Sequence, residues 1–255
     1  MNARHKHEAK LYTPNVSCIP SSFPKINLVL LPGMDGTGLL FEPLVAALDD
    51  EFTIQIIDYP IDQALGYDAL ENFVRERLPQ NEPYFILGES FSGPIAMSIA
   101  ASRPPLLKGV ILCATFARNP RPVFGLFQNF VGAAPVSIMP TRALGVALLG
   151  SFATPARLAA LASALARVAP AVLHARVREV LAVDVTEKLS AIDTPILYLQ
   201  AARDRVVPSS AAALIASHVP HMRVEVFDAP HFLFQCQPAQ SAQLILRFVK
   251  SLGEL

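Results

Sequence analysis

Short apolar runs recur along most of this chain, separated by longer segments that contain more polar residues. Most runs are apolar throughout, which is typical of strands in a parallel sheet covered by helices on both faces. The predicted strands are 26–31, 52–57, 84–87, 110–113, 196–200 and 222–228. The predicted helices are 42–48, 67–78, 92–102, 211–218 and 241–252. The pattern predicts an α/β fold with a mostly parallel sheet of about six strands.

One segment departs from this alternation. Residues 117–185 predict helices broken by prolines, rich in alanine, leucine and arginine, and contain no evident strand. An insertion of about 70 residues is far longer than the usual link of a few residues, so we expect a helical cap or lid. The predicted organisation is a flexible arm at 1–24, a core at 25–116 and 186–255, and the cap at 117–185.

Composition limits the class of protein. Hydrophobic residues make up 52% of the chain and charged residues 16%, which suits a sizeable core, and zero net charge gives no general attraction to nucleic acid. The cysteines Cys18, Cys113 and Cys236 are too scattered for a disulfide framework or a metal cluster. The N-terminus has no apolar run resembling a signal peptide, and Asn129, Pro135 and Pro140 interrupt the uncharged stretch 122–141. We therefore expect no membrane span and a cytoplasmic location.

The stretch FILGESFSG, residues 85–93, places Ser90 between a predicted strand and a predicted helix. Such a sharp turn requires small residues two positions away on either side, and the helix amides favour negative charge at the serine. Gly88 and Ser92 are those residues, giving G-x-S-x-S instead of G-x-S-x-G, with Gly93 one position later. We interpret Ser90 as a nucleophile. The alternatives are that Ser92 has this role, or that Ser90 is only a helix N-cap.

A serine nucleophile needs a base to take its proton and a carboxylate to orient that base. His231 follows the last predicted strand, and Asp204 follows the strand before it, so both are expected at the sheet edge that carries Ser90. Serine, aspartate, histidine is the order expected for sheet enzymes of this kind. Asp228 is a weaker candidate because it ends the same strand as the histidine, and Asp193 is weaker because it precedes its strand. The other five histidines are expected to be solvated or structural.

A nucleophilic attack on a carbonyl also needs two amides that bind the oxyanion. The N–H of Phe91, directly after the serine, is one candidate. The loop LPGMDGTG after the first strand offers the other, the N–H of Met34, with Gly33 turning the chain. The glycines of this loop have the order G-x-x-G-x-G, which matches neither the dinucleotide fingerprint nor the phosphate loop.

The segments LPGMDGTG, LGESFSG, ARDRVVP and APHF, in this order, resemble the α/β-hydrolase family. The resemblance extends from about residue 25 to the end of the chain. It implies a cap domain after the fourth predicted strand, and two further strands at the start for which this chain has little room. Within the family, the chain resembles small bacterial carboxylesterases, including those that demethylate pimeloyl-acyl-carrier protein.

These residues predict a serine carboxylic-ester hydrolase that works through an acyl-enzyme, with no cofactor and no metal. Thioesterase, acyltransferase and perhydrolase reactions use the same triad and remain open. The rival from another class is a protein of the same fold that binds a ligand without catalysis.

Charge is distributed unevenly along the chain. No aspartate or glutamate lies between Glu89 and Glu179, although this stretch is rich in arginine. A basic rim of this kind predicts an anionic partner such as an acyl-carrier protein or a coenzyme A ester; the alternative is an ordinary solvated surface. The predicted substrate contacts are Phe124, Phe127, Arg121, Arg142 and Arg157.

Overall fold

The structure, a computed structural model, describes residues 25–48, 51–121 and 141–253. The predicted arm at 1–24 and the predicted substrate contacts Phe124 and Phe127 lie outside the described residues, as does the side chain of Arg142.

Six parallel strands form one sheet, in the order β2-β1-β3-β4-β5-β6. The strands are β1 (Ile26–Leu31), β2 (Phe52–Ile56), β3 (Tyr84–Glu89), β4 (Leu107–Cys113), β5 (Ile196–Ala201) and β6 (Arg223–Phe227). The order changes direction at β1 and β3, so the loops that follow these two neighbouring strands leave the same sheet edge. The predicted fold class is confirmed.

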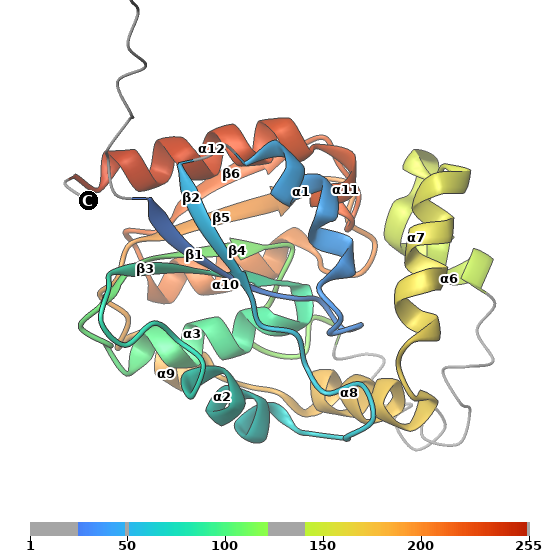
Figure 1. The fold of residues 1–255 in the computed structure, drawn as a ribbon, viewed down its shortest axis with the longest axis horizontal. Helices are drawn as coiled ribbons and strands as arrows, with labels where there is room; N and C mark the ends of the chain where they lie inside the picture. Colours follow the sequence, from blue (N-terminus) through green and yellow to red (C-terminus); the bar gives the residue numbers. More distant parts are fainter. Residues whose placement is uncertain (1–24, 49–50, 122–140, 254–255) are drawn as a thin grey trace, which may run out of the picture.

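Helices cover both faces of the sheet (Figure 1). One face carries α1 (Glu42–Ala47), α11 (Leu233–Cys236) and α12 (Pro238–Ser251). The other carries α2 (Tyr67–Arg75), α3 (Gly93–Ala101), α9 (Thr186–Leu189) and α10 (Ser209–His218). Successive residues of β1 separate the two cores, because Leu28 and Leu30 pack on the first face while Val29 and Leu31 pack on the second. This two-sided burial is the physical reason for the continuous apolar runs in the sequence.

The boundary of β4 differs from the prediction. The strand begins at Leu107, three residues before the predicted start at residue 110, and includes the exposed Lys108. Gly109 packs closely on Phe85, since a Cβ at this glycine would lie 2.8 Å from the phenylalanine ring. A charged residue and a glycine interrupt the apolar pattern here, and the register with β3 shifts at Lys108, because Tyr84 pairs with Leu107 while Phe85 pairs with Gly109.

Between β4 and β5 lie α6 (Thr141–Leu149), α7 (Pro155–Ala166) and α8 (Pro170–Ala182), to one side of the sheet (Figure 1). The chain enters and leaves this helical region side by side, because the Val185 amide donates to the Ala117 carbonyl at 2.8 Å. Leu149 and Leu161 of the region share a buried cluster with Leu40 and Phe232 of the rest of the protein. Its description as a cap domain with boundaries at 117 and 185 remains a prediction.

Within the described residues, no single helix has both the length and the apolar character needed to cross a membrane. The helices α7 and α8 meet this requirement only when they are counted together, and a bend of 101° separates them.

Candidate active site

A tight turn holds Ser90 at the carboxyl end of β3. Its φ of 48° is in the left-handed region, which a residue with a side chain adopts only at some energetic cost. Position 88 requires a glycine, since a Cβ there would lie 2.9 Å from the carbonyl oxygen of Ser92. Ser90 itself is partly exposed. This is the geometry that presents a serine hydroxyl at the tip of a strand.

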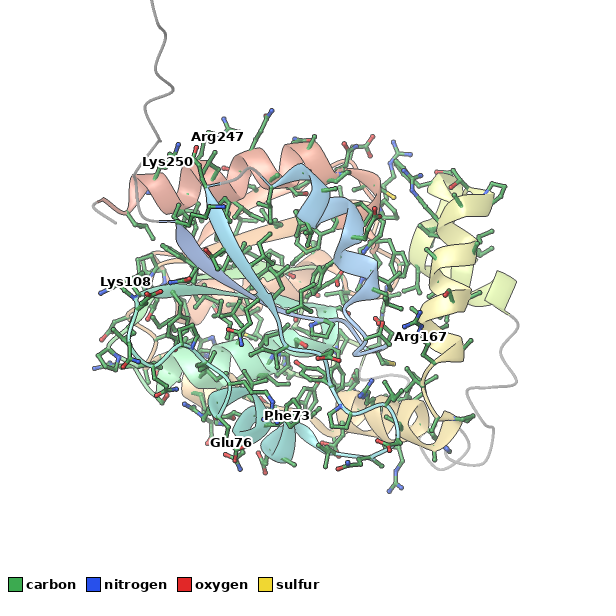
Figure 2. The ribbon with its side chains drawn as sticks, viewed as in Figure 1. Phe73, Glu76, Lys108, Arg167, Arg247 and Lys250 are labelled. Carbon is green, nitrogen blue, oxygen red and sulfur yellow. The ribbon has the colours of Figure 1, made fainter. Side chains whose placement is uncertain are left out.

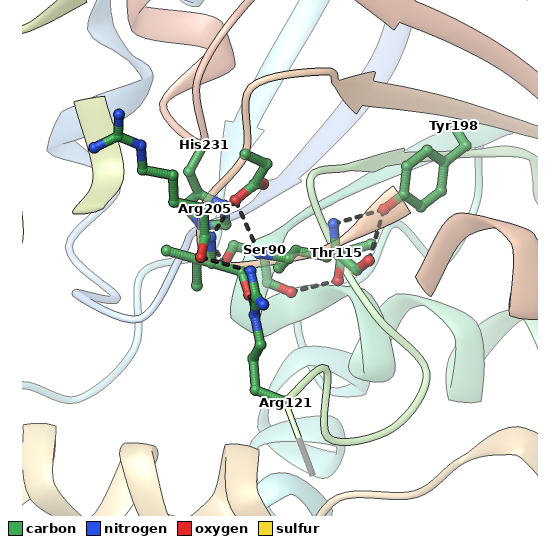
Figure 3. Close-up of polar contacts among 9 residues, drawn as sticks. Ser90, Thr115, Arg121, Tyr198, Arg205 and His231 are labelled. Carbon is green, nitrogen blue, oxygen red and sulfur yellow. Dashed lines mark hydrogen bonds and ion pairs between the residues drawn. The ribbon is translucent and has the colours of Figure 1, made fainter. Parts of the chain in front are cut away.

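Thr115, just after β4, stabilises this strained turn. Its hydroxyl donates to the carbonyl oxygen of Ser90. The Tyr198 hydroxyl, from β5, accepts from the Thr115 amide at 3.1 Å and donates to the Thr115 carbonyl at 2.6 Å (Figure 3). Gly93 leaves room for Thr115. Sequence reasoning missed both supporting residues; the signal was the glycine one position later than the usual pattern.

Ser92, the alternative nucleophile, is fully buried and engaged. Its hydroxyl donates to the carbonyl oxygen of Pro32 and lies 2.6 Å from the Tyr59 hydroxyl. Pro32 directly follows β1, so Ser92 ties the turn after β3 to the loop after β1. These bonds give Ser92 a structural role and leave Ser90 as the candidate nucleophile.

The structure brings the three predicted catalytic side chains into one hydrogen-bonded series. The Ser90 Oγ lies 2.9 Å from Nε2 of His231, and the His231 Nδ1 lies 2.7 Å from Oδ2 of Asp204. The other carboxylate oxygen of Asp204 accepts from the amides of Val206 (2.7 Å) and Val207 (2.8 Å). The carboxylate is therefore held facing the histidine, and the histidine faces the serine.

The two weaker candidates for the acid lie elsewhere. The side chain of Asp228 is 69% exposed and forms an ion pair with Arg203. Asp193 pairs with Arg103 at 2.9 Å and precedes its strand, at the opposite edge of the sheet. Neither contacts His231, so Asp204 is the carboxylate that the geometry favours.

The pKa of His231 depends on opposing influences. Burial alone would lower this pKa, but the charge and the hydrogen bond of Asp204, together with the charge of Glu89, raise it above its ordinary value. A stabilised imidazolium suits a group that accepts the serine proton and later returns it.

Glu89 is a second buried carboxyl next to the serine, and sequence reasoning missed it. Burial and the negative charge of Asp35 raise the pKa of Glu89 to about 7, although His231, Gln235 and the Gly33 amide act in the opposite direction. The signal in the sequence was an acidic residue at the end of an otherwise apolar run.

The two predicted oxyanion amides belong to adjacent loops. In the described part of the chain, the N–H of Met34 donates to no other group. The N–H of Phe91 lies in the first turn of η2 (Ser90–Ser92), where amides lack intrahelical acceptors. Tyr67 supports Phe91 by stacking at 4.7 Å and by donating its hydroxyl to the Phe91 carbonyl at 3.0 Å. The loop after β1 is stabilised by Asp35, which accepts from the Thr37 amide at 2.9 Å.

Two arginines predicted to contact substrate bind backbone carbonyls. The Arg121 guanidinium donates to Arg205 at 2.8 Å and Val206 at 3.2 Å, in the loop that holds Asp204 (Figure 3). Arg157 donates to the carbonyls of Gln235 at 3.1 Å and of Phe152 at 2.8 Å. Arg121 therefore supports the loop that holds Asp204, and Arg157 joins α11 to the short helix η4 (Gly150–Phe152). Contact of either arginine with a substrate remains a prediction.

Other chemical groups are sparse in the described ranges. There, no cluster of three or more histidine, cysteine, aspartate or glutamate side chains is placed to hold a metal ion. Cys113 is buried, and burial raises the pKa of its thiol. The cluster of chemical interest is therefore the one around Ser90.

The family model Hydrolase_4, described as serine aminopeptidase, S33, matches residues 66–234, which include Ser90, Asp204 and His231. The chain belongs to this family. This membership, together with the esterases among its relatives and structural neighbours, confirms the prediction of an esterase-type hydrolase. A thermophilic esterase from Thermogutta terrifontis has the same fold, with a TM-score of 0.77 at 20% identity over 91% of this chain and 92% of that one.

Two curated relatives match this chain over very different lengths. The chain is 25% identical to a pimeloyl-[acyl-carrier protein] methyl ester esterase from Nitrosomonas europaea over 223 residues, which cover 80% of this chain and 87% of that protein. It is 32% identical to phytyl ester synthase 1, chloroplastic, from Arabidopsis thaliana over 102 residues, which cover 36% of this chain. The chain spans only 14% of that second protein.

Proposed function

We propose that this protein is a serine carboxylic-ester hydrolase with Ser90, His231 and Asp204 as its catalytic triad. The observation that carries the proposal is the continuous series of hydrogen bonds from Ser90 through His231 to Asp204. The turn at Ser90 and the unpaired amide of Met34 among the described residues support the same reading.

The reaction follows from this geometry. The Ser90 Oγ attacks the ester carbonyl carbon while its proton passes to Nε2 of His231. The carbonyl oxygen becomes an oxyanion that accepts hydrogen bonds from the Met34 and Phe91 amides. His231 then gives its proton to the leaving alkoxide, which leaves an acyl-enzyme. A water molecule, deprotonated by His231, attacks the acyl carbon, and the return of the proton to Ser90 releases the acid.

We propose a carrier-bound acyl ester, such as the methyl ester of a pimeloyl group on acyl-carrier protein, as the substrate. The match to a pimeloyl-[acyl-carrier protein] methyl ester esterase, over 80% of this chain and 87% of that protein, supports this choice. Exposed arginines of the helical region, Arg118 and Arg167, add support because a carrier protein is anionic. Figure 2 shows Arg167 at the end of α7, and Lys108 on the far side of the protein. The basic surface relevant to substrate therefore belongs to the helical region.

A second candidate is acyl transfer to an alcohol. The partial match to phytyl ester synthase 1 favours it, since that name describes ester synthesis. The same acyl-enzyme would form, and an alcohol would replace water in the second step. Incubation with an ester and a long-chain alcohol separates the two reactions, because transfer gives a new ester whereas hydrolysis gives only the free acid.

The primary test is covalent labelling with a fluorophosphonate, followed by an ester panel that includes acyl-carrier-protein methyl esters. Wild-type protein should label at Ser90 and hydrolyse esters, and Ser90→Ala should do neither. Ser92→Ala is the matched control because it removes the neighbouring hydroxyl, and it should still label. Labelling at Ser92, or no labelling with a ligand still bound, would refute the proposed function.

A further inference from the structure

Arg176 on α8 is a buried cation that the proposed mechanism does not use. It is 1% exposed and heads the group of largest fully buried side chains among the described residues. Its guanidinium donates through Nη1 to the carbonyls of Met34 (2.9 Å) and Asp35 (2.8 Å), and through Nη2 to that of Pro60 (3.0 Å). The helical region thus reaches under the loop that carries one proposed oxyanion amide.

The loop is shaped around this guanidinium. Gly36 has a φ of 69°, and a Cβ there would lie 2.5 Å from the Arg176 Nη1. The Gly36 carbonyl also accepts from the Tyr59 amide at 2.8 Å, which joins the loop to the segment after β2. A side chain at position 36 would collide with the guanidinium, so the close contact between Arg176 and this loop requires a glycine there.

Arg176 acts one peptide unit away from the free amide. The held carbonyl of Met34 belongs to the rigid peptide plane that links it to Asp35. The N–H of Met34 belongs to the preceding plane, and only the dihedral angles of Met34 separate the two. Fixing the carbonyl therefore restricts the direction in which the amide points.

Glu179, one helical turn later on α8, reaches the other amide indirectly. Its carboxylate accepts from the Tyr67 amide at 2.9 Å, at the first residue of α2. A Cβ on Gly66 would lie 3.0 Å from this carboxylate, so the approach is again close. Tyr67 in turn stacks on Phe91 and donates to its carbonyl. Residues three apart lie on one face of a helix, so α8 contacts both supports at once.

We propose that α8 is a clamp on the oxyanion hole, with Arg176 and Glu179 as positioning residues for the Met34 and Phe91 amides. The inference rests on the proposed ester hydrolysis. It assigns the helical region a part in the rate of the chemical step, beyond its expected part in substrate selection.

The test compares Arg176→Met and Arg176→Lys with Arg247→Met. Arg247 is an exposed arginine on α12, far from α8 (Figure 2). This control therefore makes the same chemical change at a position outside the proposed clamp. The endpoint of fluorophosphonate labelling counts active sites, and kcat and KM for a small neutral ester are then expressed per labelled site. Arg176→Met should lower kcat by about 10- to 100-fold with little change in KM, because an oxyanion donor is displaced. Arg176→Lys should be intermediate, and Arg247→Met should match wild type.

A trifluoromethyl ketone provides a readout that a purely structural role would not change. Its tetrahedral adduct on Ser90 places an oxyanion between the two amides, so the affinity of Arg176→Met for the ketone should fall by the same factor as kcat. Glu179→Leu should behave similarly, whereas Glu179→Gln keeps an oxygen for the Tyr67 amide and should restore most activity.

If the arginine variants do not fold, Tyr67→Phe still tests the proposed clamp. It preserves the stacked ring and removes only the bond to the Phe91 carbonyl, and kcat per site should fall several-fold. Wild-type kcat and ketone affinity per labelled site in Tyr67→Phe and in every folded α8 variant would overturn the clamp. Wild-type protein that neither labels nor hydrolyses esters would overturn the proposed function, and this inference with it.

Discussion

The Cβ that Gly93 lacks would lie 1.9 Å from the hydroxyl oxygen of Thr115. This single relationship explains the unusual G-x-S-x-S-G spacing around Ser90. The glycine is needed where Thr115 crosses the turn to bind the Ser90 carbonyl, and position 92 is free to carry a serine that binds Pro32 and Tyr59.

Restoring the common G-x-S-x-G pattern with Ser92→Gly should therefore destabilise the folded protein. The substitution leaves the Tyr59 hydroxyl without its partner in a buried place, and we expect a loss of about 1–3 kcal/mol in the free energy of unfolding. Urea unfolding measures the loss, and labelling at Ser90 should persist. A Ser92→Gly variant as stable as wild type would show that these bonds contribute nothing.

The candidate acid is tested by a matched pair of substitutions. Asp204→Asn should lower kcat by several orders of magnitude, because the histidine loses the carboxylate that orients it and stabilises its cation. Asp228→Asn makes the same change directly after β6, at an exposed ion pair, and kcat should stay near wild type. Steady-state kinetics on one ester decides the assignment, and the reverse ranking of the two variants would reassign the acid to Asp228.

The pH dependence should report His231. Only neutral histidine accepts the serine proton, and the pKa of His231 is raised, so kcat/KM should fall as pH decreases through a midpoint above the ordinary value of 6.5. Glu89→Gln removes one of the charges that raise this pKa, so the midpoint should move to lower pH. A pH profile for each protein on a neutral ester measures the shift, and a midpoint that moves upward would contradict it.

Glu89 should also make stability depend on pH. Its pKa is raised in the folded protein, from 4.5 to about 7, so the folded state binds the proton more tightly than the unfolded state. The contribution is complete below the unfolded value and is lost as pH rises through the folded value. Glu89→Gln should therefore be more stable than wild type above pH 7, by roughly 3 kcal/mol at most, and should lose this advantage near pH 4.5. Denaturant unfolding at both pH values measures the difference, and an equal effect at both would exclude titration of Glu89.

The strands and the candidate triad were predictable because each depends on local pattern. Ser90, Asp204 and His231 all follow apolar runs, and parallel strands bring their carboxyl ends to one edge. The support around them was not predictable in this way. Thr115, Tyr198 and Arg176 act through contacts between distant segments, and nothing in their own neighbourhoods marks them. The same reason limited the interpretation of Arg121 and Arg157, whose backbone partners become visible only in the folded chain.

These backbone contacts change how the basic surface should be tested. Reversing the charge of Arg121 or Arg157 would also break their hydrogen bonds to the backbone, so the result would have two causes. Arg118 and Arg167 are exposed and offer a cleaner choice. For the wild type, kcat/KM on a carrier-bound ester should fall steeply with added salt, because screening shortens to about 10 Å at 0.1 M, whereas a small neutral ester should be almost unaffected. Arg167→Glu should lower kcat/KM for the carrier-bound ester and spare the neutral one. Arg247→Glu makes the same reversal on α12 and should spare both. An equal salt response for the two substrates, or equal effects of the two reversals, would mean that the arginines of the helical region are ordinary surface residues.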